Sequence, residues 1–219
     1  MYRKAYGSRA LVPKREPMTL DTIFDAASLT KVVATTSCIM KLFEQGKIRL
    51  NDPVTGYLPE FQGGHSSITV RNLLTHFSGL RPDLDLEPQW SGYQTGIDRA
   101  LIDQPRTPPG VRFVHSHINF ILLGEIVHRL SGKTLAQYAK DNIFDPLAMK
   151  HTRFQRHGGG VARTPPMELC PLGVARTGWG VPNRTTPGTA AVPERAGRWT
   201  TPHAVALVLH QRLHTDNPI

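Results

Sequence analysis

The stretch Phe24-Asp25-Ala26-Ala27-Ser28-Leu29-Thr30-Lys31 places a serine three residues before a lysine, where a helix is predicted to begin. Residues three apart lie on one face of a helix, so we expect the two side chains to adjoin. A serine hydroxyl becomes a good nucleophile when a neighbouring base removes its proton. A lysine amine can be that base when burial, nearby positive charge and the positive end of a helix lower its pKa. The spacing therefore indicates that Ser28 is a nucleophile and Lys31 its base.

The same four-residue pattern also fits a structural role, in which the serine caps a helix and the lysine is solvated. The following residues favour a buried helix, which we expect to run from about Ser28 to Gly46. Its core-facing side chains are predicted from their helical spacing, and they are Val32, Val33, Ile39, Met40 and Phe43. Cys38 lies in this helix, and we expect it to be a small buried side chain.

Residues 21–61 closely resemble the β-lactamase-related serine hydrolases, a family that includes class C β-lactamases, family VIII esterases and D-alanyl-D-alanine peptidases. The segments that carry the resemblance are DTIFDAASLTK, LFEQGKIRLNDPV and YLPEF, and it continues in ITVRNLLTHFSGL and GEIVHRLSGKTLAQYAKDNIFDPLAMKHTRF. It implies an α+β fold of the β-lactamase/penicillin-binding-protein type, with mostly the helical region present and the antiparallel sheet largely missing. Within ITVRNLLTHFSGL, we expect His76 and Ser78 to fix a loop by hydrogen bonds.

A third catalytic group of the family is a tyrosine in a Tyr-Ser-Asn or Tyr-Ser-Asp segment. This chain has His115-Ser116-His117 in an otherwise matching segment. The resemblance implies that His115 replaces the tyrosine in proton transfer and that His117 faces the substrate. An imidazole can move protons, but it is shorter than a phenol and is neutral or cationic near pH 7. Two interpretations stay open: a working site with a substituted group, and a site that has lost activity.

The reaction implied by the resemblance is acyl transfer to water, with an acyl-enzyme formed on an ester or amide. The substrate would be a small molecule, namely a β-lactam, a short ester or a D-amino-acid peptide. This chemistry needs no metal or organic cofactor, and the histidines lack ligand spacing such as H-E-x-x-H. The alternative is a truncated, catalytically inactive relative with at most a ligand-binding role. The absence of the family's downstream Lys-Thr-Gly or His-Thr-Gly motif favours this alternative.

The composition changes after residue 156, because residues 157–219 contain no lysine or tyrosine and are rich in proline, glycine and arginine. We therefore predict a partial β-lactamase-related domain over 1–156, and a tail over 157–219 that is poorly ordered or read out of frame. Within this irregular tail, only Ala204–Leu213 is predicted to form a short helix.

The formal net charge is +9, but the basic residues form no dense patch and no nucleic-acid motif occurs, so we expect no nucleic-acid partner. No apolar run is long enough to span a membrane, and no apolar signal region follows the basic N-terminal residues. The chain as written is expected to stay in the cytoplasm. Many members of the family are exported, however, so the compartment stays open.

Overall fold

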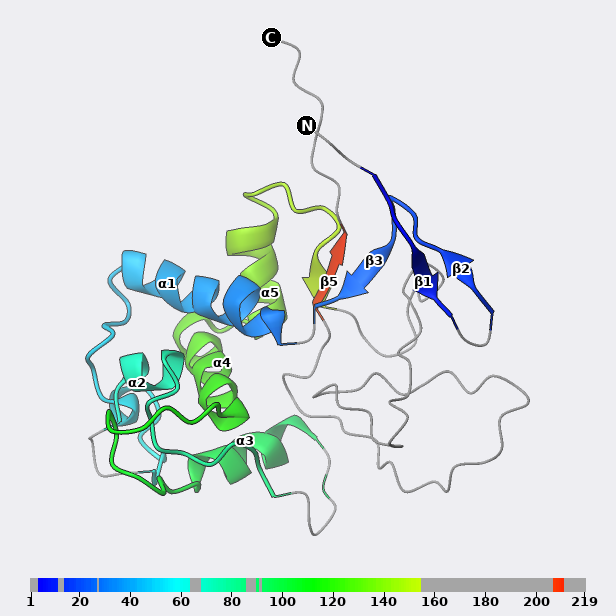
Figure 1. Ribbon diagram of the computed structural model, residues 1–219. Coiled ribbons are helices and arrows are strands. Elements are labelled where there is room, and N and C mark those ends of the chain that lie inside the picture. Colours follow the sequence, from blue (N-terminus) through cyan, green and yellow to red (C-terminus); the bar gives the residue numbers. More distant parts are fainter. Residues whose placement is uncertain are drawn as a thin grey trace. The chain divides into compact units, whose positions relative to one another are not determined.

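In a computed structural model, the described residues are 4–11, 14–26, 28–63, 68–85, 90, 92–154 and the strand 207–210 (Figure 1). The chain divides into two units. The first unit comprises Met1–Leu29, Met149–Ala196 and Val205–Ile219, and the second comprises Thr30–Ala148 and Gly197–Ala204.

The first unit contains short antiparallel strands. Strand β1 (Ser8–Ala10) pairs with β2 (Glu16–Pro17), and a second sheet has the strand order β3-β5-β4. In that sheet, β5 (Leu207–His210) lies between β3 (Ile23–Asp25) and β4 (Arg153–Phe154).

Strand β5 shows that the predicted helix at Ala204–Leu213 is wrong for its central residues. A short apolar run does not separate strand from helix by its period, and pairing on both edges decides for the strand here. The remainder of the tail predicted over 157–219 lies outside the described residues, so its predicted disorder stays a prediction.

The helix predicted to follow Ser28 contains two segments, a π-helix η1 (Lys31–Thr36) and an α-helix α1 (Ser37–Glu44). Most residues of η1 are β-branched, and such side chains crowd the preceding turn of an α-helix. The wider turn of the π-helix relieves the crowding of these β-branched side chains at the start of the helix. The Ser37 hydroxyl donates to the Val32 carbonyl five residues back, at 3.2 Å.

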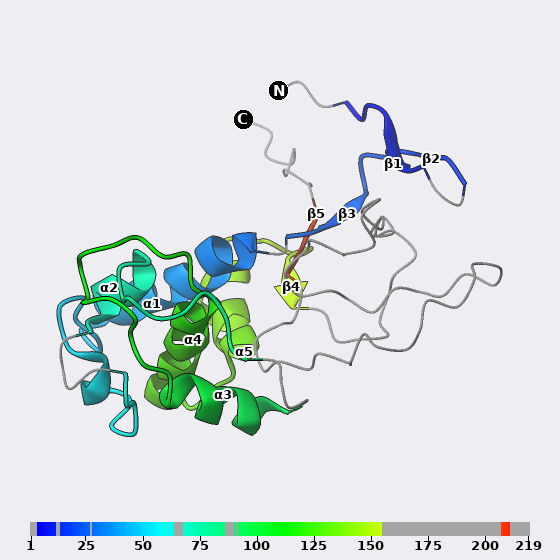
Figure 2. The same ribbon diagram turned by 60° about the horizontal axis from the view of Figure 1, so that its bottom comes forward.

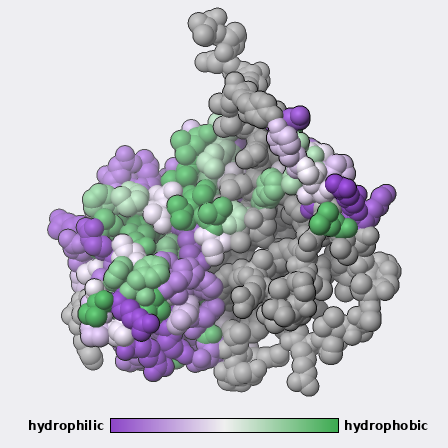
Figure 3. All heavy atoms as spheres, in the orientation of Figure 1, coloured by the Kyte–Doolittle hydropathy of each residue, from purple (hydrophilic) through white to green (hydrophobic). Residues whose placement is uncertain are grey.

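The face of this helix that packs inward differs from the predicted one. Its buried residues are Ala34, Thr35, Cys38, Ile39 and Leu42. The prediction is therefore right for Cys38 and Ile39. It is wrong for Val32, Met40 and Phe43, which are 63%, 41% and 43% exposed, while Val33 is half-buried. The helix is apolar around most of its circumference, so its sequence alone did not select a face. Figure 3 shows hydrophobic side chains reaching the surface over α1.

Helix α4 (His117–Ser131) forms the core of the second unit (Figures 1 and 2). Every residue from Ile118 to Val127 is buried. The helix packs against η1, α1, α2 (Val70–Leu74), α3 (Tyr93–Leu101) and α5 (Leu135–Ala139). A short 3-10 helix, η2 (Val54–Gly56), lies in the connection between α1 and α2. Among the described helices, none is long and apolar enough to cross a membrane.

A buried carboxylate joins α3 and α4. Glu125 is 5% exposed, and it accepts hydrogen bonds from the Tyr93 hydroxyl and from Arg129 Nε, the latter at 2.8 Å. The Arg129 guanidinium also donates to both carboxylate oxygens of Glu60, at 2.8 and 2.9 Å. The buried charge is therefore both paired and hydrogen-bonded, as a buried carboxylate requires.

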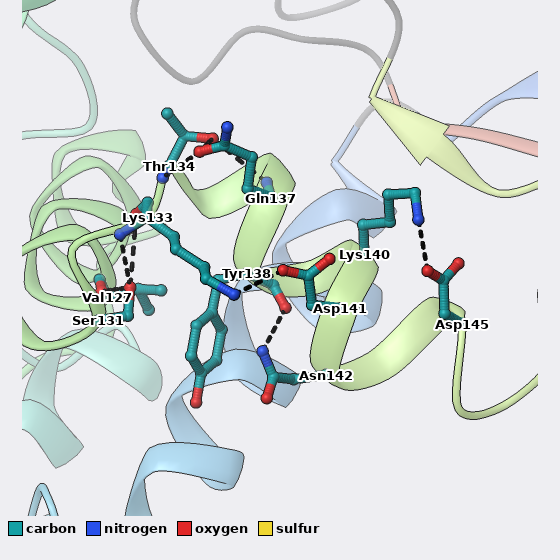
Figure 4. Close-up of polar contacts among 10 residues, drawn as sticks. All are labelled: Val127, Ser131, Lys133, Thr134, Gln137, Tyr138, Lys140, Asp141, Asn142 and Asp145. Atoms are coloured by element: carbon teal, nitrogen blue, oxygen red, sulfur yellow. Dashed lines mark hydrogen bonds and ion pairs between the residues drawn. The ribbon is translucent and has the colours of Figure 1, made fainter.

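Helix α5 begins with a reciprocal cap, which Figure 4 shows. The Thr134 hydroxyl accepts from the Gln137 N–H at 3.2 Å, and the Gln137 side chain accepts from the Thr134 N–H at 3.0 Å. The π-helix η3 (Lys140–Phe144) continues α5. The apolar face of this helix is formed by the buried residues Leu135, Tyr138 and Ala139, whereas Ile143 is only half-buried.

Substituting Arg129 by methionine should destabilise the second unit, because the buried Glu125 carboxylate would lose its cation. We expect a loss of about 1–3 kcal/mol in the free energy of unfolding, measured by urea denaturation. Lys133→Met is the matched control, because its exposed pair with Asp141 (Figure 4) is solvated on both sides. Equal stabilities of the two variants would contradict this account of Glu125.

Substituting Ala148 by glycine should stabilise the chain. Ala148 has φ +53°, a left-handed conformation that costs a residue with a Cβ about 1 kcal/mol. We expect a rise of about 0.5–1 kcal/mol in the free energy of unfolding. Ala136→Gly within α5 is the control and should lower stability, because glycine is a poor helix former. A fall in stability for Ala148→Gly would show that this turn is unstrained.

Candidate active site

The predicted nucleophile and the other predicted site residues lie in different units. Ser28 is exposed and belongs to the first unit, in a turn where the Leu29 N–H donates to the Ala26 carbonyl at 2.8 Å. Lys31, His115 and His117 all belong to the second unit. The pairing of Ser28 with Lys31 therefore rests on their spacing in the sequence.

The loop after α2 is fixed by a buried hydrogen-bond network. The Ser78 hydroxyl donates to Asn119 Oδ1 at 2.7 Å and accepts from the Leu80 N–H at 3.2 Å. The fully buried Asn119 donates to the Leu73 carbonyl at 3.1 Å, which ties the loop to α2 and α4. Gly79 has φ +80°, and a Cβ there would lie 2.0 Å from the Thr107 carbonyl oxygen. Only glycine fits this approach, and the predicted loop-fixing role of Ser78 is confirmed.

His76 ties the same loop to the segment that precedes α4. Its backbone carbonyl accepts from the Val114 N–H at 2.9 Å, and its Nδ1 accepts from the Ser116 N–H at 3.0 Å. The Ser116 hydroxyl donates to the Arg81 carbonyl at 2.6 Å, and it caps α4. The predicted loop-fixing role of His76 is therefore also confirmed.

These bonds gather three imidazole rings. The centroids of the His76 and His115 rings are 4.6 Å apart, and those of the His115 and His117 rings are 5.2 Å apart. His117 Nδ1 lies 3.0 Å from a carboxylate oxygen of Asp83. The structure thus brings the predicted site residues His115 and His117 together. It adds His76 and Asp83, which the sequence did not mark as site residues.

Lys31 lies against this cluster. Its Nζ is 5.9 Å from the centroid of the Phe120 ring, and the Phe120 ring lies 5.2 Å from that of His76. Burial lowers the pKa of the Lys31 ammonium from its ordinary value of 10.5, and the Asp83 carboxylate partly opposes this shift. Burial is therefore the main cause of the lowered pKa that a lysine base requires.

His76 and His115 both have a pKa below 6.5, which leaves their imidazoles neutral at pH 7. Burial is the largest cause of the lowered pKa of His76, and together with the nearby charges of His115, Lys31 and His117 it lowers this pKa from 6.5 to about 4. Burial also lowers the pKa of His115, with smaller contributions from His117 and Lys31. A neutral imidazole can accept a proton at one ring nitrogen and donate from the other.

The cluster does not resemble a metal centre. Across the part of the chain that the structure describes, no three His, Cys, Asp or Glu side chains are arranged to hold a metal ion. The arrangement holds a lysine of lowered pKa beside neutral imidazoles. Both kinds of group are suited to proton transfer.

The lowered pKa of His76 predicts a loss of stability in acid. Between pH 6.5 and about pH 4, the unfolded chain binds a proton at this residue and the folded chain does not, so acid favours unfolding. The contribution of His76 to the free energy of unfolding should be fully present above pH 6.5. It should be lost progressively as the pH falls to about 4 and should not change further below that pH. Because the ring is only half-buried and solvent screens it, we expect a total loss of about 1–2 kcal/mol in the free energy of unfolding. Urea denaturation at several pH values checks this, and an equal loss in His76→Asn would contradict it.

Comparisons with known proteins agree with the predicted fold. A beta-lactamase family model matches residues 1–210, which extends past residue 156. An N-acetylmuramyl-L-alanine amidase of Bacillus subtilis (strain 168) is 33% identical over 167 residues, covering 70% of this chain and 38% of the amidase. The chain thus spans well under half the length of the first curated relatives that it matches.

Solved structures give the same result. A penicillin-binding protein homologue from Pyrococcus abyssi is 28% identical with a TM-score of 0.64, covering 80% of this chain and 42% of that chain. A beta-lactamase/D-alanine carboxypeptidase from Yersinia pestis is 25% identical with a TM-score of 0.63, and the match covers 74% of this chain and 49% of that chain. These likenesses confirm the α+β fold of the β-lactamase/penicillin-binding-protein type. The chain belongs to the beta-lactamase family.

Proposed function

We propose that this chain carries the catalytic groups of a serine hydrolase that acts through an acyl-enzyme. Ser28 Oγ attacks an ester or amide carbonyl as Lys31 Nζ accepts the hydroxyl proton, and the alcohol or amine then leaves with a proton. Water hydrolyses the acyl-enzyme, which frees the acid and restores Ser28. His115 passes the proton to the leaving group, and His117 faces the substrate.

The observation that carries this proposal is the environment of Lys31. A solvated lysine is protonated at pH 7 and cannot accept a proton, whereas burial lowers the pKa of Lys31. The neutral imidazole of His115 lies in the same cluster, where its ring can take a proton from one side and release it on the other. A helix cap followed by a solvated lysine, which is the structural alternative, would not place Lys31 against Phe120 and the histidines.

The substrate class is proposed from the relatives. The Bacillus subtilis relative is named as an amidase, and the Yersinia pestis structure is titled as a beta-lactamase/D-alanine carboxypeptidase. Both names concern amide bonds, so we propose a small amide or ester substrate, with D-amino-acid peptides, β-lactams and short esters as the compounds to test.

A fluorophosphonate probe tests the nucleophile. We expect the intact mass to increase by one adduct in the parent chain and to stay unchanged in Ser28→Ala. Ser131→Ala is the control and should label like the parent, because Ser131 lies at the opposite end of α4 from His117, about 21 Å away along the helix axis. A folded circular-dichroism spectrum without an adduct would favour the inactive, ligand-binding relative instead.

The same probe tests the base. The labelling rate should rise with pH and reach half its maximum below pH 10.5, because Lys31 must be deprotonated to act. Lys31→Met should lower the rate at pH 7.5 by about a hundredfold or more. Lys41→Met is the matched control on α1, where the lysine pairs with Glu44 in solvent, and it should label at the parent rate. Equal rates in the two variants would exclude Lys31 as the base.

A further inference from the structure

His76 accepts hydrogen bonds from the backbone N–H groups of Val114 and Ser116, the two residues on either side of His115. Its carbonyl oxygen accepts from the Val114 N–H and its ring Nδ1 accepts from the Ser116 N–H. One residue thus fixes the backbone on each side of a proposed proton-transfer group. His76 does so at φ +62°, a left-handed conformation that costs a non-glycine residue about 1 kcal/mol. Such a conformation persists where the surrounding interactions hold it.

The ring of His76 also supports the ring of His115 directly. The two rings are tilted by 36° at a centroid distance of 4.6 Å. Phe113 and Phe120 lie against the His76 ring at 5.7 and 5.2 Å, so it is held by aromatic side chains from the segment before α4 and from α4 itself. The imidazole of His115 therefore packs on a ring that is fixed.

The tautomer of His76 follows from its hydrogen bond. Because the Ser116 N–H is a donor, Nδ1 must be unprotonated, which leaves the proton of the neutral ring on Nε2. Asn119 Nδ2, a second donor, is 3.5 Å from the same nitrogen. The charged or titratable groups that face this cluster are Lys31 from η1, His115 and His117 from the segment at the start of α4, and Asp83 beside His117. Protonation of Nδ1 would break the bond to Ser116 and add a positive charge next to Lys31.

We propose that His76 is the positioning residue of the site, which aligns the imidazole of His115 for proton transfer by holding the backbone N–H groups of Val114 and Ser116 and by packing against its ring. This role goes beyond fixing a loop and rests on the proposed function of His115. His76 itself exchanges no proton with the substrate, and it must stay neutral to act.

The variants His76→Asn and His76→Ala separate this role from general stability. The asparagine Oδ1 can replace Nδ1 as the acceptor, and asparagine tolerates a left-handed backbone. Alanine has no acceptor, and its backbone is strained there. His128→Ala is the control, because His128 lies near the other end of α4 and its ring contacts only the Lys133 carbonyl and Tyr93 in the described part of the chain.

Two measurements are needed. In ¹⁵N relaxation, the amides of residues 114–116 should stay rigid in the parent and in His76→Asn, with order parameters of about 0.85, and become mobile in His76→Ala. The fluorophosphonate labelling rate should fall by about tenfold to a hundredfold in His76→Ala and be largely restored in His76→Asn. In the parent, the Ser116 amide signal should shift with an apparent pKa near 4, and this titration should disappear in both variants.

The two proposals fail in different ways. Unchanged order parameters in His76→Ala would overturn the positioning role, whatever the labelling shows. Increased mobility with a parent labelling rate would also overturn it, because His76 would then fix only the loop. A parent chain that takes no label, with the expected relaxation pattern, would overturn the hydrolase reaction and leave His76 as the residue that holds His115.

Discussion

Helix α4 is buried along ten consecutive residues, and this burial constrains every segment that meets its N-terminal turn. The polar groups at that end cannot be left to solvent, so they bond to protein. Ser116 caps the helix, and Asn119 accepts a hydrogen bond from the Ser78 hydroxyl. Backbone N–H groups of the segment before the helix donate to His76. The loop after α2, the segment before α4 and the helix itself therefore form one hydrogen-bonded assembly.

The electrostatics of the cluster follow from the same burial. Burial is the largest cause of the lowered pKa of Lys31, His76 and His115. Nearby positive charges lower the pKa of His76 and of His115 as well. The Asp83 carboxylate raises the pKa of Lys31 and so partly opposes the effect of burial, and it also lies against His117. The imidazoles of His76 and His115 thus stay neutral at pH 7, and the pKa of the Lys31 ammonium is lowered in the direction that a general base requires.

The histidines at 115 and 117 are the feature in which this chain departs from the pattern that its sequence resembles. Where that pattern has a phenol that acts as an anion, this chain has an imidazole that is neutral. A neutral ring lacks the negative charge of a phenolate. Under the proposed function, the site therefore depends on keeping its nitrogen bases unprotonated, and His76 takes part in that by accepting a peptide N–H at Nδ1. Two apolar side chains of α1, Met40 and Phe43, remain partly exposed.

Local sequence determined much of this protein. The motif around Ser28 and Lys31, the capped helices and the buried Cys38 follow from residue types and their spacing, because caps and helical periods are short-range properties. The family also follows from the sequence, through segments that extend over most of the helical unit. Only the tertiary structure decided which face of α1 packs inward, that Leu207–His210 pairs as a strand, and that Asp83 and His76 join the site. Each of these depends on contacts between residues far apart in the chain. A helix that is apolar on most sides, a short apolar run or a histidine in a loop has no fixed role until its neighbours in space are known.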